Sequence, residues 1–232
     1  MLGAVASYLG VAQLAPARVK FVVAQLMLAG VAGVAVGILH RGRPLAALGL
    51  RGARLRFFVA AIAMGATAWY PNAWLFDWLF AKLALPREQA SHLQALVDRP
   101  PLWWAIAMFA MLPAVCEEIV FRGVLARSLG RRMSLAAAAA IAGVVFSAYH
   151  LSLVQALPTL TLGMLLAVIA IRADSIAPSM VAHALNNALV IAASRGALPG
   201  LMDWLERHPV AGLVGCAAAT ASGVVIAARG SA

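Results

Sequence analysis

The sequence predicts an all-α fold, a polytopic bundle of transmembrane helices with about seven spans (six to eight). Of its 232 residues, 64% are hydrophobic and 11% are charged, and the mean hydropathy is +0.92. A soluble domain is about half apolar and about a quarter charged. This composition excludes a disordered chain and an ordinary soluble enzyme, and it predicts one integral-membrane domain over residues 1–232.

A spanning helix needs about 20 apolar residues, and seven segments approach that length. They are Lys20–His40, Arg56–Trp78, Leu102–Arg127, Met133–His150, Leu153–Ile171, Ile176–Ser194 and Val210–Ala228. The opening stretch Met1–Ala15 is apolar but short, so it fits either an eighth span or a segment at the membrane interface. We expect an integral protein of a bacterial-type inner membrane.

The basic residues lie between the apolar segments and do not form one patch. The formal net charge is +10, from 18 Lys and Arg against 8 Asp and Glu. Such a distribution is typical of loops at an anionic cytoplasmic leaflet, so the lipid bilayer is the expected partner and nucleic acid is not. The Arg-rich connections Arg41–Arg54 and Arg127–Arg132 are predicted to be cytoplasmic. The six tryptophans lie near the opposite boundary, as a one-sided interfacial belt would.

The third predicted span contains, late in its length, two adjacent glutamates, Glu117 and Glu118, followed by Arg122. Charged groups inside a membrane are costly and are therefore candidates for function. Glu118 and Arg122 are four residues apart on a helix, with the acid first, so they can pair. Glu117 points about 100° away and has no cation nearby in the sequence. We therefore expect Glu118 to be structural and Glu117 to be a carboxylate available for chemistry.

Two histidines and an asparagine lie in later spans at a similar depth. His150 ends the fourth span, and His183 and Asn187 share one face of the sixth. A carboxylate and imidazoles at one depth can accept and pass on a proton, and the imidazoles and the amide of Asn187 can donate hydrogen bonds. We therefore expect Glu117, His150, His183 and Asn187 to converge in one site.

Three motifs occur in order along the chain, and together they resemble one family. They are Glu-Glu-x-x-x-Arg at 117–122, Phe-x-x-x-His at 146–150 and His-x-x-x-Asn at 183–187. The chain resembles the type II CAAX prenyl endopeptidase and bacteriocin-processing family of glutamic-type intramembrane proteases, over about Lys20 to Ser194, with residues 102–194 as the catalytic core. The resemblance implies water activation by Glu117 and His150, an oxyanion site of His183 and Asn187, and support from Glu118 and Arg122. It implies a membrane-anchored peptide or protein substrate and no cofactor.

The sequence alone leaves other catalytic mechanisms and other functions open. A cysteine mechanism would use Cys116, and a serine dyad would use Ser147 with His150. A zinc site could be formed by Glu117, His150 and His183, although a His-Glu-x-x-His helix is lacking. A proton-coupled transporter or channel could use the same ionisable groups as a relay. A catalytically idle protein of the bacteriocin-immunity type is a further alternative.

Overall fold

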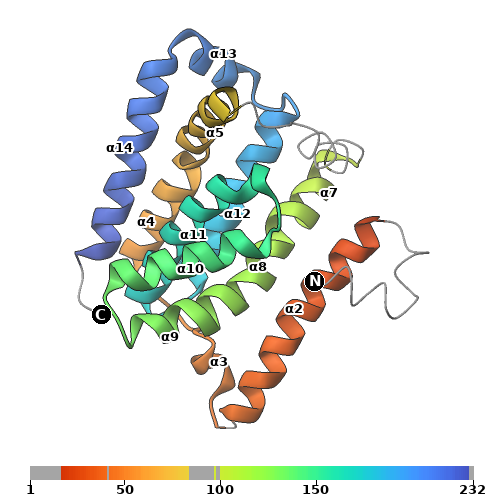
Figure 1. Cartoon of the computed structure of the whole chain (residues 1–232), viewed down its shortest axis with the longest axis vertical. Helices are drawn as coiled ribbons and strands as arrows, with labels where there is room; N and C mark the ends of the chain where they lie inside the picture. Colours follow the sequence, from red (N-terminus) through yellow and green to blue (C-terminus); the bar gives the residue numbers. More distant parts are fainter. Residues whose placement is uncertain (1–16, 41, 84–96, 98–99, 230–232) are drawn as a thin grey trace.

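The computed structural model describes residues 17–40, 42–83, 97 and 100–229, and within these ranges the chain is helical without β-strands. The predicted all-α bundle is confirmed. The opening stretch Met1–Ala15 lies outside the described residues. The elements, labelled in Figure 1, are α2 (Ala17–Leu39), α3 (Pro44–Ala47), α4 (Leu55–Thr67), α5 (Trp69–Leu83), α7 (Leu102–Ile106), η1 (Ala107–Met111), α8 (Leu112–Glu118), η2 (Ile119–Ala126), α9 (Arg127–Gly130), α10 (Leu135–Tyr149), α11 (Leu153–Ala173), α12 (Ala177–Ser194), α13 (Pro199–Arg207) and α14 (Pro209–Ala228).

Four of the described helical stretches have the length and apolar composition to cross a membrane. They are Arg18–Leu39, Leu102–Gly130, Gln155–Ala173 and Pro209–Ala228. Two further predicted spans are present as α10, an apolar helix of 15 residues, and as α12, of 18 residues. The polar side chains of α12 lower its hydropathy, and two of them, His183 and Asn187, are predicted site residues. The cost of placing them in lipid is offset if they face the bundle interior.

The second predicted span, Arg56–Trp78, is wrong in its bounds. The structure divides this region into α4 and α5, which meet at Ala68, and α5 continues to Leu83. Proline has no backbone N–H, so Pro71 cannot make the helical bond back to Thr67. It stands in the first turn of α5, where proline is tolerated. The interruption follows from this residue, which the hydropathy pattern alone does not reveal.

The third span is one continuous stretch of five segments from α7 to α9. It contains two π-helical parts, η1 before Pro113 and η2 after Glu118. Segments of π-helix inside α-helices are rare and often mark functional positions. Here they flank the seven-residue helix α8, which carries both glutamates and ends at Glu118.

Small residues bring α10 and α11 into close contact. A Cβ atom added to Gly163 would lie 2.9 Å from the Cα atom of Gly143 and 3.1 Å from the ring of Phe146. Ala139 and Ala142 of α10 are buried in the same region, and such small residues allow two helices to pack closely. Helix α11 also contacts η2, and the carbonyl oxygen of Gly163 lies near the side chain of Arg122.

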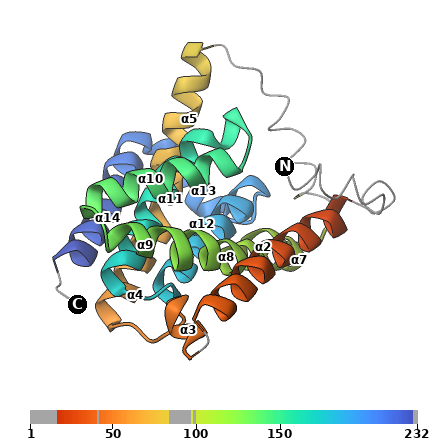
Figure 2. The ribbon, with the colours of Figure 1, turned by 60° about the horizontal axis from the view of Figure 1, so that its bottom comes forward.

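Helix α2 lies along one side of the bundle and contacts mainly α8 and η2 (Figures 1 and 2). Most of its side chains are at least partly exposed, and among its apolar residues Val36 is buried. Gln25 is buried as well, although it is polar. A lipid-facing helix therefore turns one polar side chain toward the bundle.

Candidate functional site

The centre of the candidate site is a buried ion pair on the third span. Arg122 Nη1 lies 2.8 Å from Glu118 Oε1, and the two side chains are 1% and 0% exposed, respectively. This is the i,i+4 pair predicted from the sequence. An unpaired charge at this depth would be strongly unfavourable, so each partner stabilises the burial of the other.

Arg122 is also held by two other elements. Its guanidinium carbon lies 4.2 Å from the centre of the Phe146 ring of α10, a cation–π contact. Its Nη2 atom lies 3.4 Å from the carbonyl oxygen of Gly163 on α11. The close packing of α10 against α11 brings both partners within reach of one side chain.

His183 of α12 stands between the two glutamates. Its Nδ1 lies 3.0 Å from Glu118 Oε1, and its Nε2 lies 3.9 Å from Glu117 Oε2. Helix α12 packs closely against α4 directly before His183. A Cβ atom added to Gly65 of α4 would lie 2.5 Å from the carbonyl oxygen of Ala182. Three predicted site positions from two spans, Glu117, Glu118 and His183, therefore meet in the structure.

Glu117 has a partner that the sequence did not reveal. The Nε2 group of Gln25 on α2 donates a hydrogen bond of 2.8 Å to Glu117 Oε1, and both residues are buried. The two positions are 92 residues apart, so no local spacing indicates their contact. The available signal was that Gln25 is the one polar residue of α2 after Lys20.

The charges of this buried group balance with one additional proton. Arg122 carries one positive charge and the two carboxylates carry two negative charges, so the group is neutral when one proton lies on His183 or on Glu117. A net charge at low dielectric is costly. Glu117 and His183 are therefore the two groups in this cluster that could share that proton.

His150 joins the group through an aromatic ring. The ring of Phe146 lies 4.8 Å from the ring of His150 and 5.8 Å from that of His183, with edge-to-face geometry in both cases. The Nδ1 atom of His150 lies 2.9 Å from the carbonyl oxygen of Phe146. A carbonyl only accepts, so this contact places the proton of a neutral imidazole on Nδ1 and leaves Nε2 as an acceptor.

Asn187 is one helical turn beyond His183 and is partly buried. Its side-chain oxygen accepts a hydrogen bond of 3.3 Å from the amide group of the buried Asn186. This contact uses the oxygen and not the N–H groups of Asn187. The structure thus gives Asn187 a neighbour that sequence reasoning did not include.

Two rival nucleophiles have other surroundings. The hydroxyl of Ser147 donates a 2.7 Å hydrogen bond to the carbonyl oxygen of Ala156. The free thiol of Cys116 is buried next to Glu117 in the sequence. Within the described part of the chain, no three His, Cys, Asp or Glu side chains are grouped so that they could hold a metal ion. That the site works without a metal stays a prediction.

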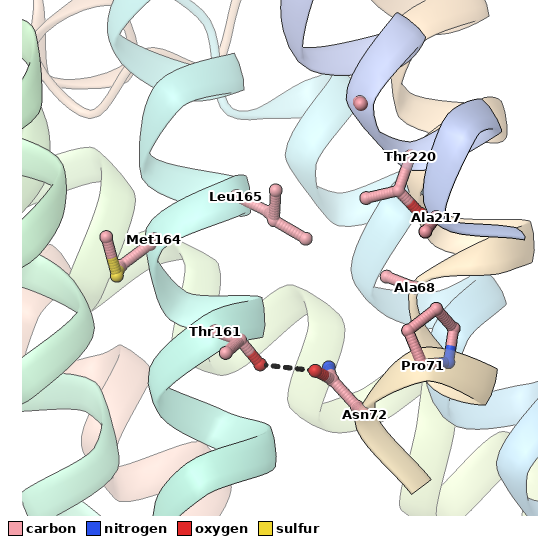
Figure 3. Close-up of a pocket in the computed structure, with 9 residues that line it drawn as sticks. Ala68, Pro71, Asn72, Thr161, Met164, Leu165, Ala217 and Thr220 are labelled. Atoms are coloured by element: carbon pink, nitrogen blue, oxygen red, sulfur yellow. Dashed lines mark hydrogen bonds between the residues drawn. The ribbon is translucent and has the colours of Figure 1, made fainter. Parts of the chain in front are cut away.

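An apolar pocket of about 370 Å³ lies apart from this cluster, between α5, α11 and α14 (Figure 3). Two of its polar side chains are joined to each other, because Thr161 Oγ1 donates to Asn72 Oδ1 over 2.8 Å. Thr161 and Gly163 are two residues apart on α11 and therefore face opposite sides of that helix. None of the predicted site residues lines this pocket.

Comparisons with known proteins identify the segment that carries the cluster. Residues 99–189 match the family model described as type II CAAX prenyl endopeptidase Rce1-like. No curated protein and no solved structure matches the chain. The matched segment contains all three motifs and extends from α7 into α12. Over this segment, the chain is similar to the Rce1-like family of type II CAAX prenyl endopeptidases, and its apolar helices make it an integral membrane protein.

Proposed function

We propose that the chain is an intramembrane endopeptidase. It hydrolyses a peptide bond of a membrane-anchored or lipidated protein with water activated at Glu117 and His150. The observation that carries this proposal is the approach of His183 to within 3.9 Å of the buried Glu117, across helices that are far apart in the sequence. A base and a hydrogen-bonding imidazole at one buried point are what the hydrolysis of an amide requires.

Glu117 is the proposed base. A water molecule bound to its carboxylate attacks the scissile carbonyl carbon, and one proton passes from the water to Glu117. Glu117 then gives this proton to Nε2 of His150, which the bond to Phe146 leaves as an acceptor. His150 delivers the proton to the leaving nitrogen as the bond between carbon and nitrogen breaks, so both side chains return to their starting protonation states.

The oxyanion is stabilised by His183 and Asn187 in this proposal. With Nδ1 donating to Glu118, His183 can present a second N–H at Nε2 only as an imidazolium. A transition state that places negative charge near Nε2 favours that form. The amide group of Asn187 is the second donor. Glu118 and Arg122 keep the imidazole in place and the buried charges balanced.

The test compares the wild-type chain with Glu117→Gln in proteoliposomes. The probe is a quenched fluorogenic peptide with a farnesylated cysteine in a C-terminal CAAX sequence, and a second probe carries the peptide on a transmembrane helix. The variant keeps the shape of the side chain and removes the base. Turnover should fall by about 10²-fold or more, while the protein still accumulates in the membrane. Equal cleavage by the variant and the wild type would refute this function.

A further inference from the structure

Gln25 differs from every residue around it on α2. Most of this helix is at least partly exposed and apolar, and its neighbours Leu26 and Met27 are 55% and 43% exposed. Gln25 itself is 4% exposed and points at Glu117. A polar amide in an apolar helix is unfavourable in lipid unless its hydrogen bonds are formed inside the protein.

The bond to Glu117 fixes the orientation of the amide. An ionised carboxylate only accepts hydrogen bonds, so the amide must present its N–H group to it. The opposite orientation would place two oxygens against each other. Gln25 Nε2 occupies Oε1 of the carboxylate, and Oε2 faces His183. The two oxygens of Glu117 are thus held from two sides, by α2 and by α12.

The amide oxygen of Gln25 is buried and has no hydrogen-bond partner among the described residues. A buried acceptor without a donor costs free energy, and such an atom in a native site calls for a ligand or water. The amide nitrogen and oxygen of Gln25 share one carbon, so this acceptor lies beside the carboxylate of Glu117. A water molecule there can donate one hydrogen to Glu117 and the other to Gln25.

We propose that Gln25 is a positioning residue for hydrolysis: its Nε2 group fixes the carboxylate of Glu117, and its Oε1 atom orients the attacking water. This inference rests on the proposed function. It extends the site to α2, outside the segment 99–189 that matches the family model. No bond to Gln25 forms or breaks, and the proton of the water goes to Glu117.

The experiment uses the full chain in proteoliposomes and the farnesylated fluorogenic peptide as the probe. Gln25→Met keeps the length of the side chain and removes both the donor and the acceptor. Leu26→Met places the same residue on the lipid-facing side of the same turn and is the matched control. For Gln25→Met, kcat should fall about 10- to 100-fold, as expected for loss of a hydrogen bond to a charged group, while KM stays within about twofold. The control should match the wild type.

A second variant covers the case in which Gln25→Met fails to fold. Gln25→Asn keeps the amide and its polarity but is one methylene shorter, so the amide is withdrawn from Glu117. It should accumulate normally and show the same loss of kcat. An unchanged kcat in either variant, or a rise in KM with kcat unchanged, would overturn the proposal.

Thermal unfolding in detergent provides a readout that does not depend on activity. The loss in melting temperature caused by Gln25→Met should shrink when Glu117 is already replaced by Met, because the bond is then absent in both chains. Independent effects of the two changes would show that the contact does not form, and the inference would fail. If the coupling is present but the wild type cleaves neither probe, the proposed function is refuted and the contact is structural only.

Discussion

The carboxylate of Glu118 holds the imidazole of His183 by its Nδ1 atom, at 3.0 Å, and so directs Nε2 toward Glu117. Partners of this kind fix the tautomer and the orientation of a histidine without touching a substrate. Glu118 also binds Arg122, so one carboxylate serves the charge balance and the geometry of the site together. The two functions can be separated by mutation.

Arg122→Ala should reduce the amount of folded protein. The change leaves the fully buried Glu118 without its ion-pair partner and removes the cation–π contact with Phe146. Breaking a buried pair from one side costs about 3–5 kcal/mol. We expect a lower yield from the membrane and a lower melting temperature in detergent, along with lost turnover. If yield and melting temperature are unchanged while turnover is lost, Arg122 is instead a contact of the substrate or transition state.

Replacing both partners should separate stability from catalysis. The double variant Glu118→Gln with Arg122→Met removes both charges and keeps much of the volume, so part of the lost yield should return. His183 loses its carboxylate partner in this variant, and turnover should stay about 10- to 100-fold below the wild type. Recovery of turnover together with yield would show that Glu118 has no role in orienting His183.

Phe146 is predicted to matter for geometry more than for stability. Its ring contacts His150, His183 and Arg122 at once. Phe146→Leu should cost about 1–3 kcal/mol of stability and also lower turnover, because two imidazoles lose the surface that orients them. The matched control is Phe80→Leu, a buried phenylalanine of α5 that stacks on Phe76. It should destabilise the protein to a similar extent and leave turnover per folded molecule unchanged.

The contacts within one helix could be predicted from the sequence, and those between helices largely could not. The i,i+4 rule indicated the pair of Glu118 and Arg122, and the structure contains it. The bond from Gln25 to Glu117 depends on how α2 packs against α8, which no periodicity encodes. For the same reason, sequence analysis predicted no partner for Glu117 and no contact between His183 and Glu118.

The first and last residues of the spans could likewise be predicted only in part. The apolar pattern located the third span, and the ends of α12 were also close to the prediction. The interruption at Ala68 was missed because a hydropathy window averages over Pro71, whose effect is on a single backbone bond. The π-helical segments around α8 likewise depend on local hydrogen bonding that residue composition does not specify.

The topology predicted from the charges places α3 in the cytoplasm. Figure 1 shows α3 at the end of the bundle opposite α13, and Arg127 at the α3 end binds the carbonyl oxygen of Ala47. A cysteine at the exposed Ala46, in a chain without Cys116 and Cys216, should resist an impermeant thiol reagent in intact cells. A cysteine at the exposed Leu201 of α13 should react. The reverse labelling pattern would invert the orientation.

The last prediction concerns zinc, which would also use Glu117 and His150. A catalytic zinc ion takes three protein ligands and activates its own water, so Glu117, His150 and His183 would all be ligands. Asn187 would then be left as the sole side-chain donor to the oxyanion. In the structure Glu117 instead accepts a bond from Gln25, and both imidazoles contact the ring of Phe146.

We therefore expect activity without metal. Purified protein should contain no stoichiometric zinc by elemental analysis, and dialysis against a strong chelator should leave cleavage of the farnesylated probe unchanged. The control is the same dialysis followed by added Mg²⁺ or Zn²⁺, neither of which should raise the rate. Inactivation by the chelator with recovery on Zn²⁺ but not on Mg²⁺ would assign Glu117, His150 and His183 as ligands and replace the carboxylate mechanism, because the ion and not Glu117 would then lower the cost of forming hydroxide.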